Sequence, residues 1–320
     1  MSEECVSETL SSVEGEGESK GESESGGKGE SKSECGGDDK VFVVTGAAGG
    51  LGWATVEALA ARYRARFALI DIDKKALDRR VQQLAESGIV GQTFVADLAD
   101  ESAVAKLVET LRERFVRVDL LVNNAGITHR SLSTVTSHRV IRRVMAVDYH
   151  APVELAQGLL EPLRRAQGCV VNISSMAGWM PVLGRAGYCA AKSAMHQYFE
   201  TFREEVREEG VRVLMVYPSF VATDIERNAL SGDGGKASHK QSTIGPVRSP
   251  QWMAARIVTA LEQGKERIFP FDRSLLGAFL YRLAPRFFLR QMVRNFRVEL
   301  EVGRAQRMAV AKTAPVAKQG

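Results

Sequence analysis

The residues of this 320-residue chain most able to do chemistry are a tyrosine and a lysine four positions apart, Tyr188 and Lys192. On a helix, residues i and i+4 project from one face, so the phenol and the ammonium can reach the same substrate. An ammonium beside a phenol favours the phenolate and lowers the tyrosine pKa from its free value of about 10. Such a tyrosine can give or take a proton near neutral pH. The same spacing also occurs in exposed helical pairs, so other motifs must decide between the two interpretations.

A glycine-rich turn opens at Gly46, 142 residues before the tyrosine, in the segment VFVVTGAAGGLGWATVEALA. Residues 41–44 form the continuous apolar run of a buried parallel strand. Gly50 and Gly52 complete the turn, and an apolar-periodic helix begins at about Trp53. Glycines allow a tight turn and let backbone amides approach a pyrophosphate at the positive end of a helix. This context predicts a dinucleotide site, with an ordinary strand-to-helix turn as the alternative.

Asp71 ends a second apolar segment, RFALIDID, 19 positions after Gly52. A carboxylate at this place can accept hydrogen bonds from the adenosine ribose and repels a 2′-phosphate. No arginine or lysine lies within residues 47–52 to bind such a phosphate. Asp73 is a weaker candidate for the ribose, and we expect it to open the next helix. The pattern favours NAD over NADP.

Further motifs follow in a fixed order along the chain. They are Asp97 after a third apolar run (TFVADL), Asn123-Asn124-Ala125-Gly126 after a fourth (VDLLVNNAGI), Ser174 and Ser175 in VVNISS, and Thr223 after VRVLMVYPSF. Together with the dyad and the glycine turn, these segments resemble the short-chain dehydrogenase/reductase family over about residues 40 to 270. The resemblance implies a doubly wound parallel sheet, the Rossmann fold, with an NAD(P)-dependent oxidoreductase activity on an alcohol or ketone.

The resemblance also implies roles for the site residues. Tyr188 is the general acid/base, Lys192 holds the nicotinamide ribose and lowers the tyrosine pKa, and Ser175 hydrogen-bonds the substrate oxygen. Ser174 points to the other face of its strand, because neighbouring side chains on a strand alternate. The implied cofactor contacts are Gly46, Gly50, Leu51, Gly52, Asp71, Asp97 at the adenine, Leu98, Asn124 shaping the loop, Tyr188, Lys192 and Thr223 at the nicotinamide amide.

Two positions depart from the family pattern. Asp148, in the stretch VMAVDYHAP, stands where the family has an asparagine that holds a water in the proton relay. An ionised aspartate keeps the acceptor oxygen, loses the amide donor and raises the pKa of a nearby tyrosine. We include it among the catalytic candidates. Ser219 follows Pro218 where a glycine is common, which we expect to affect only loop geometry.

The alternation of apolar strands with helical patterns also predicts an α/β fold, independently of any family. The helices are expected at about 53–65, 74–87, 101–115, 134–146, 150–166, 187–209 and 250–263. The segment from 222 to 250 falls where the family has a substrate lid, and its Gly, Ser and Lys content equally fits a plain loop. We therefore expect one Rossmann domain over residues 40–270.

Residues 1–39 form an acidic, low-complexity segment of Gly, Glu and Ser. Twelve acidic and three basic residues give this segment a charge of −9, which leaves the rest of the chain at +13. Such a composition cannot bury enough apolar surface to fold, so we expect a disordered tail. It has no basic start and apolar middle, the features of a signal peptide.

The cysteines and histidines indicate no metal site. Cys5, Cys35, Cys169 and Cys189 have no metal-ligand spacing and suggest no disulfide framework, so a reducing cytoplasm is expected. His129, after the Asn-Ala-Gly loop, either borders the substrate cleft or is a solvated loop histidine.

Residues 271–320 form a basic, amphipathic extension that we expect to be helical. Arg282, Arg286, Arg290 and Arg294 recur every four residues, with Leu289, Met292, Val293 and Phe296 on another helical face. Pro285 divides the segment, and no apolar stretch is long enough to cross a membrane. The helices either pack on the enzyme or on a second subunit, or present a basic surface to anionic lipid. The short arginine face, with no recognised motif, argues against nucleic acid.

The sequence as a whole favours an NAD-dependent oxidoreductase acting on an apolar secondary alcohol or ketone, in a homo-oligomer. The alternative is a cofactor-binding scaffold or sensor with little catalysis, which only Asp148 favours. Action on a carbon–carbon double bond ranks lower, because family members with that activity usually have a different tyrosine spacing.

Overall fold

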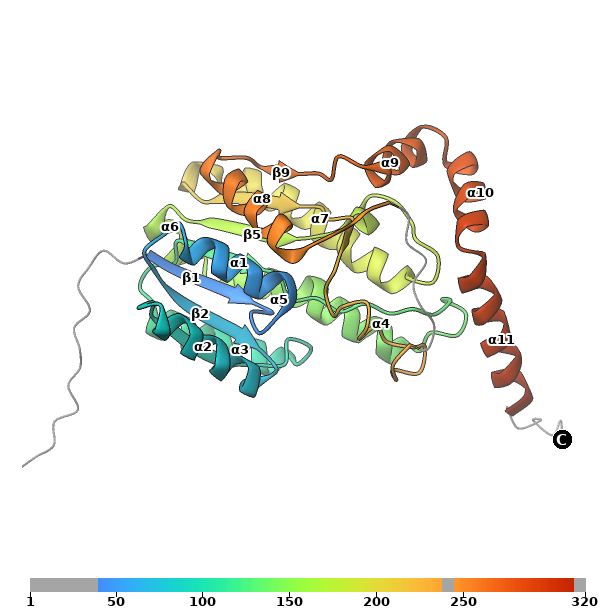
Figure 1. Ribbon diagram of the computed structural model, residues 1–320, viewed down its shortest axis with the longest axis horizontal. Coiled ribbons are helices and arrows are strands. Elements are labelled where there is room, and N and C mark those ends of the chain that lie inside the picture. Colours follow the sequence, from blue (N-terminus) through green and yellow to red (C-terminus); the bar gives the residue numbers. More distant parts are fainter. Residues whose placement is uncertain (1–39, 238–244, 314–320) are drawn as a thin grey trace, which may run out of the picture. The chain divides into compact units, whose positions relative to one another are not determined.

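A parallel sheet of seven strands runs through residues 40–237 and 245–313, the part of the chain that the computed structural model describes (Figure 1). The strands lie in the order β3 (Gly91–Val95), β2 (Ala65–Asp71), β1 (Lys40–Thr45), β4 (Leu120–Asn123), β5 (Cys169–Ile173), β6 (Arg212–Val216) and β9 (Arg267–Ile268). The chain order reverses between β1 and β4. Ligands bind outside the carboxyl ends of open parallel sheets at such a point. The predicted doubly wound fold is confirmed.

Helices cover both faces of this sheet, and successive residues of the strands alternate between the two layers. In β1, Val41 and Val43 belong to one apolar core, while Phe42 and Val44 belong to the other. The first core includes side chains of α3 (Glu101–Arg114), α5 (Ala151–Gly158), α6 (Leu160–Ala166) and α7 (Ala186–Glu205). The second includes side chains of α1 (Gly50–Ala60), α2 (Lys74–Glu86) and α8 (Pro250–Glu262). Burial on both faces explains why the strands read as continuous apolar runs.

The helix predictions agree within a residue for α2, α3 and α8. The first helix ends earlier than predicted, because β2 already begins at Ala65, and it also starts earlier, at Gly50. The helix predicted from residue 134 is α4 (His138–Met145), which starts later because the hydroxyl of Ser137 accepts from the Val140 amide at 3.4 Å. The helix predicted for 150–166 is divided between α5 and α6, and the long α7 ends at Glu205, before a single 3₁₀ turn, η3 (Arg207–Glu209).

Two short strands lie near the two ends of the segment predicted as a lid. β7 (Phe220–Val221) pairs in parallel with β8 (Val247–Arg248). This pairing was not predicted, and neither was β9, since strands of two residues are too short to show a period. Residues 238–244 of the lid segment lie outside the described residues, as do the predicted acidic tail at 1–39 and residues 314–320.

Three helices follow β9 (Figure 1). They are α9 (Arg273–Leu283), α10 (Pro285–Asn295) and α11 (Arg297–Thr313). Pro285 occupies the first turn of α10, where its missing N–H is not needed. α9 packs against α10 and against a 3₁₀ turn, η2 (Met176–Gly178), beside the carboxyl end of β5. Within the described ranges, no helix is long and apolar enough to cross a membrane.

Candidate active site

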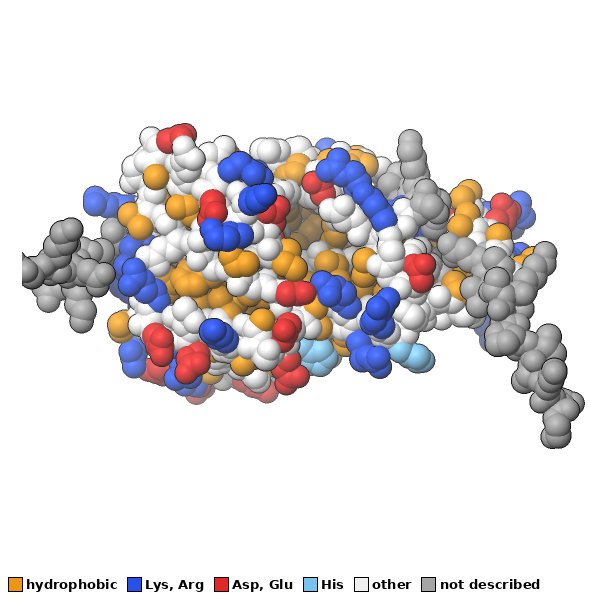
Figure 2. All heavy atoms as spheres, turned by 90° about the horizontal axis from the view of Figure 1, so that it is seen from below, with side chains coloured by type: hydrophobic (Ala, Val, Ile, Leu, Met, Phe, Trp, Pro, Cys, Tyr) orange, Lys and Arg blue, Asp and Glu red, His pale blue; other side chains and the backbone are white. Residues whose placement is uncertain are grey.

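A cleft of about 980 Å³ opens at the carboxyl ends of the strands. Its walls come from the glycine turn after β1, the ends of β2, β4 and β5, the start of α7, and the helices α9 and α10. Figure 2 shows one face of the molecule hollowed near its middle, with hydrophobic side chains in the hollow. The cleft joins a polar end at the glycine turn to an apolar end at the C-terminal helices.

The glycine turn leaves no room for side chains at two of its glycines. A Cβ atom on Gly52 would lie 2.0 Å from the carbonyl oxygen of Gly46 and 2.5 Å from Nδ2 of Asn124. Gly46 itself has φ +64° and Gly50 has φ +55°, a conformation that side chains rarely adopt. The bare backbone of this turn lines the cleft at the start of α1. This is the arrangement that a pyrophosphate requires.

Asn124 joins the end of β4 to the glycine turn. Its Nδ2 donates to the carbonyl oxygens of Thr45 at 3.0 Å and Gly46 at 3.2 Å, and its backbone amide donates to the Thr45 hydroxyl at 3.0 Å. Asn124 lines the cleft. It therefore fixes the turn against the sheet rather than reaching out into the cleft.

Two carboxylates line the polar end of the cleft. Asp71 accepts from the backbone amide of Ala48 at 3.0 Å, which ties the end of β2 to the glycine turn. Asp97 accepts from the Ala99 amide at 2.9 Å and pairs with Arg143 at 3.1 Å. Leu51, Leu98 and Thr223 also line the cleft. Asp73 caps α2 by accepting from the Ala76 amide at 3.0 Å, so its predicted helix-opening role is confirmed.

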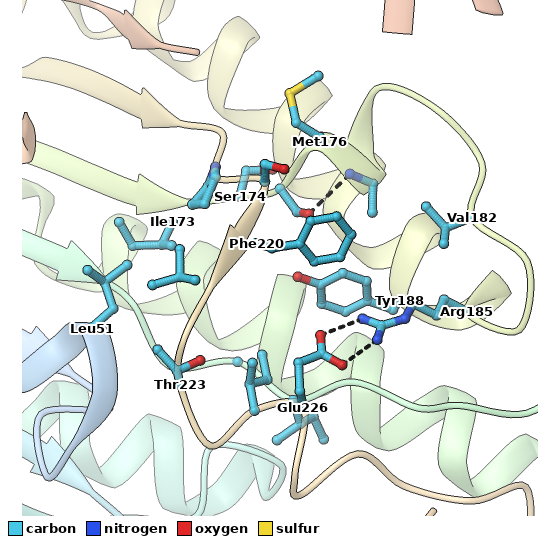
Figure 3. Close-up of a pocket in the computed structure, with 18 of the residues that line it drawn as sticks. Leu51, Ile173, Ser174, Met176, Val182, Arg185, Tyr188, Phe220, Thr223 and Glu226 are labelled. Atoms are coloured by element: carbon cyan, nitrogen blue, oxygen red, sulfur yellow. Dashed lines mark hydrogen bonds and ion pairs between the residues drawn. The ribbon is translucent and has the colours of Figure 1, made fainter. Parts of the chain in front are cut away.

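The two serines after β5 point in different directions, as the alternation predicts. The buried hydroxyl of Ser174 faces α7 and donates to the carbonyl oxygen of Lys192 at 3.4 Å. Ser175 accepts from the Ala177 amide at 3.1 Å and lies within hydrogen-bonding reach of the Tyr188 phenol. The structure therefore brings Ser175 together with Tyr188, whose ring Figure 3 shows among the residues that line the cleft.

Lys192 and Asp148 meet behind the tyrosine as a fully buried pair. The ammonium donates to the carbonyl oxygen of Ile173 at 2.9 Å and lies 3.9 Å from Oδ2 of Asp148. Oδ1 of Asp148 accepts from the Ile127 amide at 2.8 Å, whereas Oδ2 is buried without a hydrogen-bond partner. Asp148 lies on a π-helical turn, η1 (Ala146–His150), a rare geometry that is frequent at functional sites. The turn presents the carboxylate to the ammonium.

Burial dominates the protonation of these groups. Desolvation raises the pKa of Asp148 to about 6, against the opposing charge of Lys192. Desolvation, and then the charge of Asp148, raise the pKa of Tyr188 well above its usual value. The predicted effect of Asp148 on the tyrosine is confirmed in direction. The predicted lowering by Lys192 stays a prediction; in this structure the ammonium donates to the Ile173 carbonyl and lies beside Asp148.

An ion pair that was not predicted lies next to the phenol (Figure 3). Arg185 donates to both carboxylate oxygens of Glu226, with Nη1 at 2.9 Å from Oε1. Arg130 reaches the same glutamate, at 3.0 Å from Oε2. Both arginines are buried, and Glu226 comes from the segment predicted as a lid. Only the position of Arg185, one helical turn before Tyr188, could have suggested its place in the cleft.

His129 supports the helix that carries the dyad. It is fully buried, and Nε2 accepts from the backbone amide of Gly187 at 2.9 Å, at the start of α7. Desolvation lowers its pKa to about 4, so it is neutral near pH 7. Neither sequence interpretation of His129 was right, since it is neither in the cleft wall nor solvated.

The C-terminal helices form the apolar wall of the cleft. Met292 and Phe296, which the sequence placed on an apolar face of the extension, are buried there, together with Leu280 and Phe288 as lining residues. The predicted packing of the extension on the enzyme is therefore observed for Met292 and Phe296, whereas Leu289 and Val293 of the same predicted face are 38% and 45% exposed. All four arginines of the row are exposed, and Arg282 lies over the Trp179 ring at 5.7 Å.

The comparison with known proteins agrees with this geometry. A family model described as short chain dehydrogenase matches residues 40–233. The chain belongs to the short-chain dehydrogenase family. It is 36% identical over 267 residues to dehydrogenase/reductase SDR family member 7B of Bos taurus, covering 81% of this chain and 82% of the relative. This dehydrogenase is thus an oxidoreductase.

Several solved structures with the same fold hold a nicotinamide cofactor. A metagenomic short-chain oxidoreductase in complex with NADP is 26% identical, with a TM-score of 0.59, and the match covers 72% of this chain and 96% of that one. A short-chain dehydrogenase/reductase from Burkholderia phymatum in complex with NAD is 22% identical, with a TM-score of 0.67, covering 78% and 95%. The latter likeness shows the fold alone.

Proposed function

We propose that this dehydrogenase transfers a hydride between NAD and a secondary alcohol or ketone of an apolar substrate. One observation carries the proposal. Ser175 and Tyr188 meet at the middle of a cleft, with Lys192 and Asp148 directly behind the phenol and a glycine turn at its polar end. A non-catalytic scaffold has no need of this convergence. The apolar wall from α9 and α10 supports an apolar substrate.

The cleft fits a nicotinamide dinucleotide. The turn at Gly46 and Gly52 has space only for backbone, and the Ser219 hydroxyl in the cleft wall is buried without a partner. The turn would hold the pyrophosphate, Asp71 the adenosine ribose, and Thr223 the amide of the nicotinamide. When bound, the nicotinamide accepts or supplies the hydride.

The protein's own residues move the proton. The Ser175 hydroxyl binds the substrate oxygen, and Tyr188 gives its proton to that oxygen in reduction or takes one from the alcohol in oxidation. Lys192 and Asp148 lie on the buried side of the phenol, where their charges act on it with little screening. Ile173 and Ile127 orient this pair through backbone hydrogen bonds.

Cofactor choice should depend on Asp71. The arginine that reaches the turn, Arg80, is engaged there by a 3.0 Å bond to the Ala48 carbonyl and by stacking on Trp53 at 4.4 Å. Asp71→Ala combined with Ile72→Arg removes the repulsive carboxylate and adds a phosphate partner. We expect the ratio of kcat/KM for NADP over NAD to rise roughly 10- to 100-fold, the effect of one charge-assisted hydrogen bond.

The control for that change is Ile72→Gln with Asp71 intact, which keeps a long side chain without the charge. It should leave the cofactor ratio as in the wild type. A wild-type enzyme that already prefers NADP in a side-by-side comparison would show that the NAD assignment is wrong.

Asp148→Asn should keep or raise activity near neutral pH. It removes the charge that raises the Tyr188 pKa, so the phenolate forms at lower pH. In alcohol oxidation, which needs the phenolate, the rising limb of the pH–rate profile should therefore move towards acid. Asp78→Asn, the same substitution at an exposed site on α2, is the control and should not move it. A tenfold or larger loss of activity in Asp148→Asn would show that the carboxylate itself is needed for catalysis.

We further propose a homo-oligomer in the cytoplasm. The two cysteines in the described part of the chain, Cys169 and Cys189, are free thiols, and burial raises the pKa of each to about 11. Protonated, unpaired thiols fit a reducing compartment.

The proposed homo-oligomer is tested by light scattering of the purified protein, which measures its mass in solution.

The activity is tested with secondary alcohols and ketones of increasing chain length, including steroids, each offered with NAD and with NADP. The absorbance of the reduced cofactor reports turnover. We expect turnover that rises with substrate apolarity. Cofactor binding without turnover of any member would favour the scaffold alternative.

A further inference from the structure

The outer side of α9 and the start of α10 expose large apolar side chains. Leu276, Phe279, Leu283 and Phe287, here named the apolar rim, are 69%, 55%, 85% and 53% exposed. The first three are spaced i, i+3 and i+7, so they form one stripe of α9. Scattered apolar residues are normal on protein surfaces, whereas a continuous stripe marks an interaction site.

The same helices carry only positive charge. Residues 273–297 contain six arginines and no acidic residue. All six are exposed: Arg273, Arg282, Arg286, Arg290, Arg294 and Arg297. A second copy of this chain that docked through the same helices would bring the same charge to the rim and be repelled. An anionic bilayer matches both features, since apolar side chains enter the interface and arginines bind lipid phosphates.

The apolar rim is continuous with the cleft. Leu276 belongs to both, because it lines the cleft and is 69% exposed. The inner sides of the same helices supply Leu280, Phe288 and Met292 to the cleft wall. The elements that would touch lipid are therefore the elements that bound the apolar end of the site.

We propose that the apolar rim and its arginines dock the protein on the surface of an anionic bilayer, with the mouth of the cleft facing the lipid. An apolar substrate then passes between bilayer and cleft without crossing water; this step rests on the proposed function. The apolar part of this docking surface is not the apolar face that the sequence indicated. Met292 and Phe296 of that face are buried against the enzyme, and the exposed apolar rim comes mainly from α9.

Vesicle sedimentation of the full-length protein tests the docking. Vesicles of phosphatidylcholine alone are compared with vesicles that also contain phosphatidylserine, at low and at high salt. We expect binding to the anionic vesicles at low salt and release at high salt. The triple variant Arg286→Gln, Arg290→Gln, Arg294→Gln should bind on the order of 100-fold more weakly, at about fivefold for each basic residue removed. Absence of binding at low salt overturns the proposal.

The apolar half is tested with Phe279→Ser, Leu283→Ser and Phe287→Ser together, none of which lines the cleft. This variant should lose binding even at low salt. The control for the rim variant is Val116→Ser, at an apolar site between α3 and β4 that is 70% exposed. The control for the arginine variant replaces three exposed basic residues elsewhere, Arg79, Lys106 and Arg112, by glutamine. Both controls should bind as the wild type does. If the rim variant bound vesicles as well as the wild type, the rim would not be the docking surface. If the wild type bound no vesicles and the rim variant formed a smaller oligomer than the wild type, the occupant of the rim would be a second subunit.

Substrate entry is measured with two ketones, a short water-soluble one and a long-chain one placed in the anionic vesicles. The rim variant should turn over the soluble ketone normally and the vesicle-borne ketone at least tenfold more slowly. Equal loss on both ketones overturns the entry route. Sedimentation needs no turnover, so a protein inactive on every ketone would refute the proposed activity and leave the docking result standing.

Discussion

Replacing Tyr188 by phenylalanine should lower turnover by about 10²- to 10⁴-fold, the usual contribution of a general acid/base. Phenylalanine keeps the ring, which is 8% exposed, and removes only the hydroxyl that meets Ser175. Cofactor affinity should stay nearly unchanged, because the glycine turn and Asp71 are untouched. Steady-state turnover and titration of cofactor fluorescence measure the two effects separately.

Tyr198→Phe is the control, since it removes a hydroxyl bonded to Gln157 at 3.0 Å and lies outside the cleft lining. It should retain wild-type turnover. Lys192→Ala should differ from both, by losing turnover and weakening cofactor binding, because the lysine is expected to touch the ribose. If Tyr188→Phe kept more than half of the wild-type turnover, Tyr188 would not be the general acid/base.

Gly52→Ala should abolish cofactor binding and destabilise the fold. The new Cβ would lie 2.0 Å from the Gly46 carbonyl oxygen, so the turn or the start of α1 must move. Asn124 holds the same turn through two hydrogen bonds, so it cannot yield freely. Overpacking of this kind costs about 1–3 kcal/mol, and the displaced amides no longer meet a pyrophosphate. Thermal unfolding and cofactor titration measure the two losses.

Gly49→Ala is a matched control three positions away in the same turn. Its Cβ would have no neighbour within 4 Å, and its φ of −165° suits any residue. It should bind cofactor and unfold as the wild type does. Equal behaviour of the two variants, whether both damaged or both intact, would contradict the packing argument for the turn.

The sheet and its motif-bearing loops were predictable from sequence, because each strand and each motif is a short run of consecutive residues. The apolar run before Gly46 is long enough to identify a strand buried on both faces. The start of α4 was not predictable from apolar period, since it is set by a single cap at Ser137. β9 has two residues and depends on pairing with β6, so its strand character arises only from tertiary contact.

The site was less predictable where distant segments meet. Arg185 and Glu226 are 41 residues apart, and nothing in either neighbourhood indicates their contact. The pKa of Tyr188 depends first on burial and then on the charge of Asp148, and the spacing of the dyad reveals neither. In the extension, periodicity placed Leu289, Met292, Val293 and Phe296 on one apolar face. It did not show that only Met292 and Phe296 of that face are buried.

The central claim is hydride exchange between a carbinol carbon and the nicotinamide. It is tested most directly with the best secondary alcohol of the panel, deuterated at the carbinol carbon and incubated with wild-type enzyme and NAD. Mass spectrometry of the products should find deuterium in the reduced cofactor, in equal amount to the ketone formed. Ketone formed with unlabelled cofactor, or no reduction of NAD or NADP by any alcohol of the panel, would contradict the account.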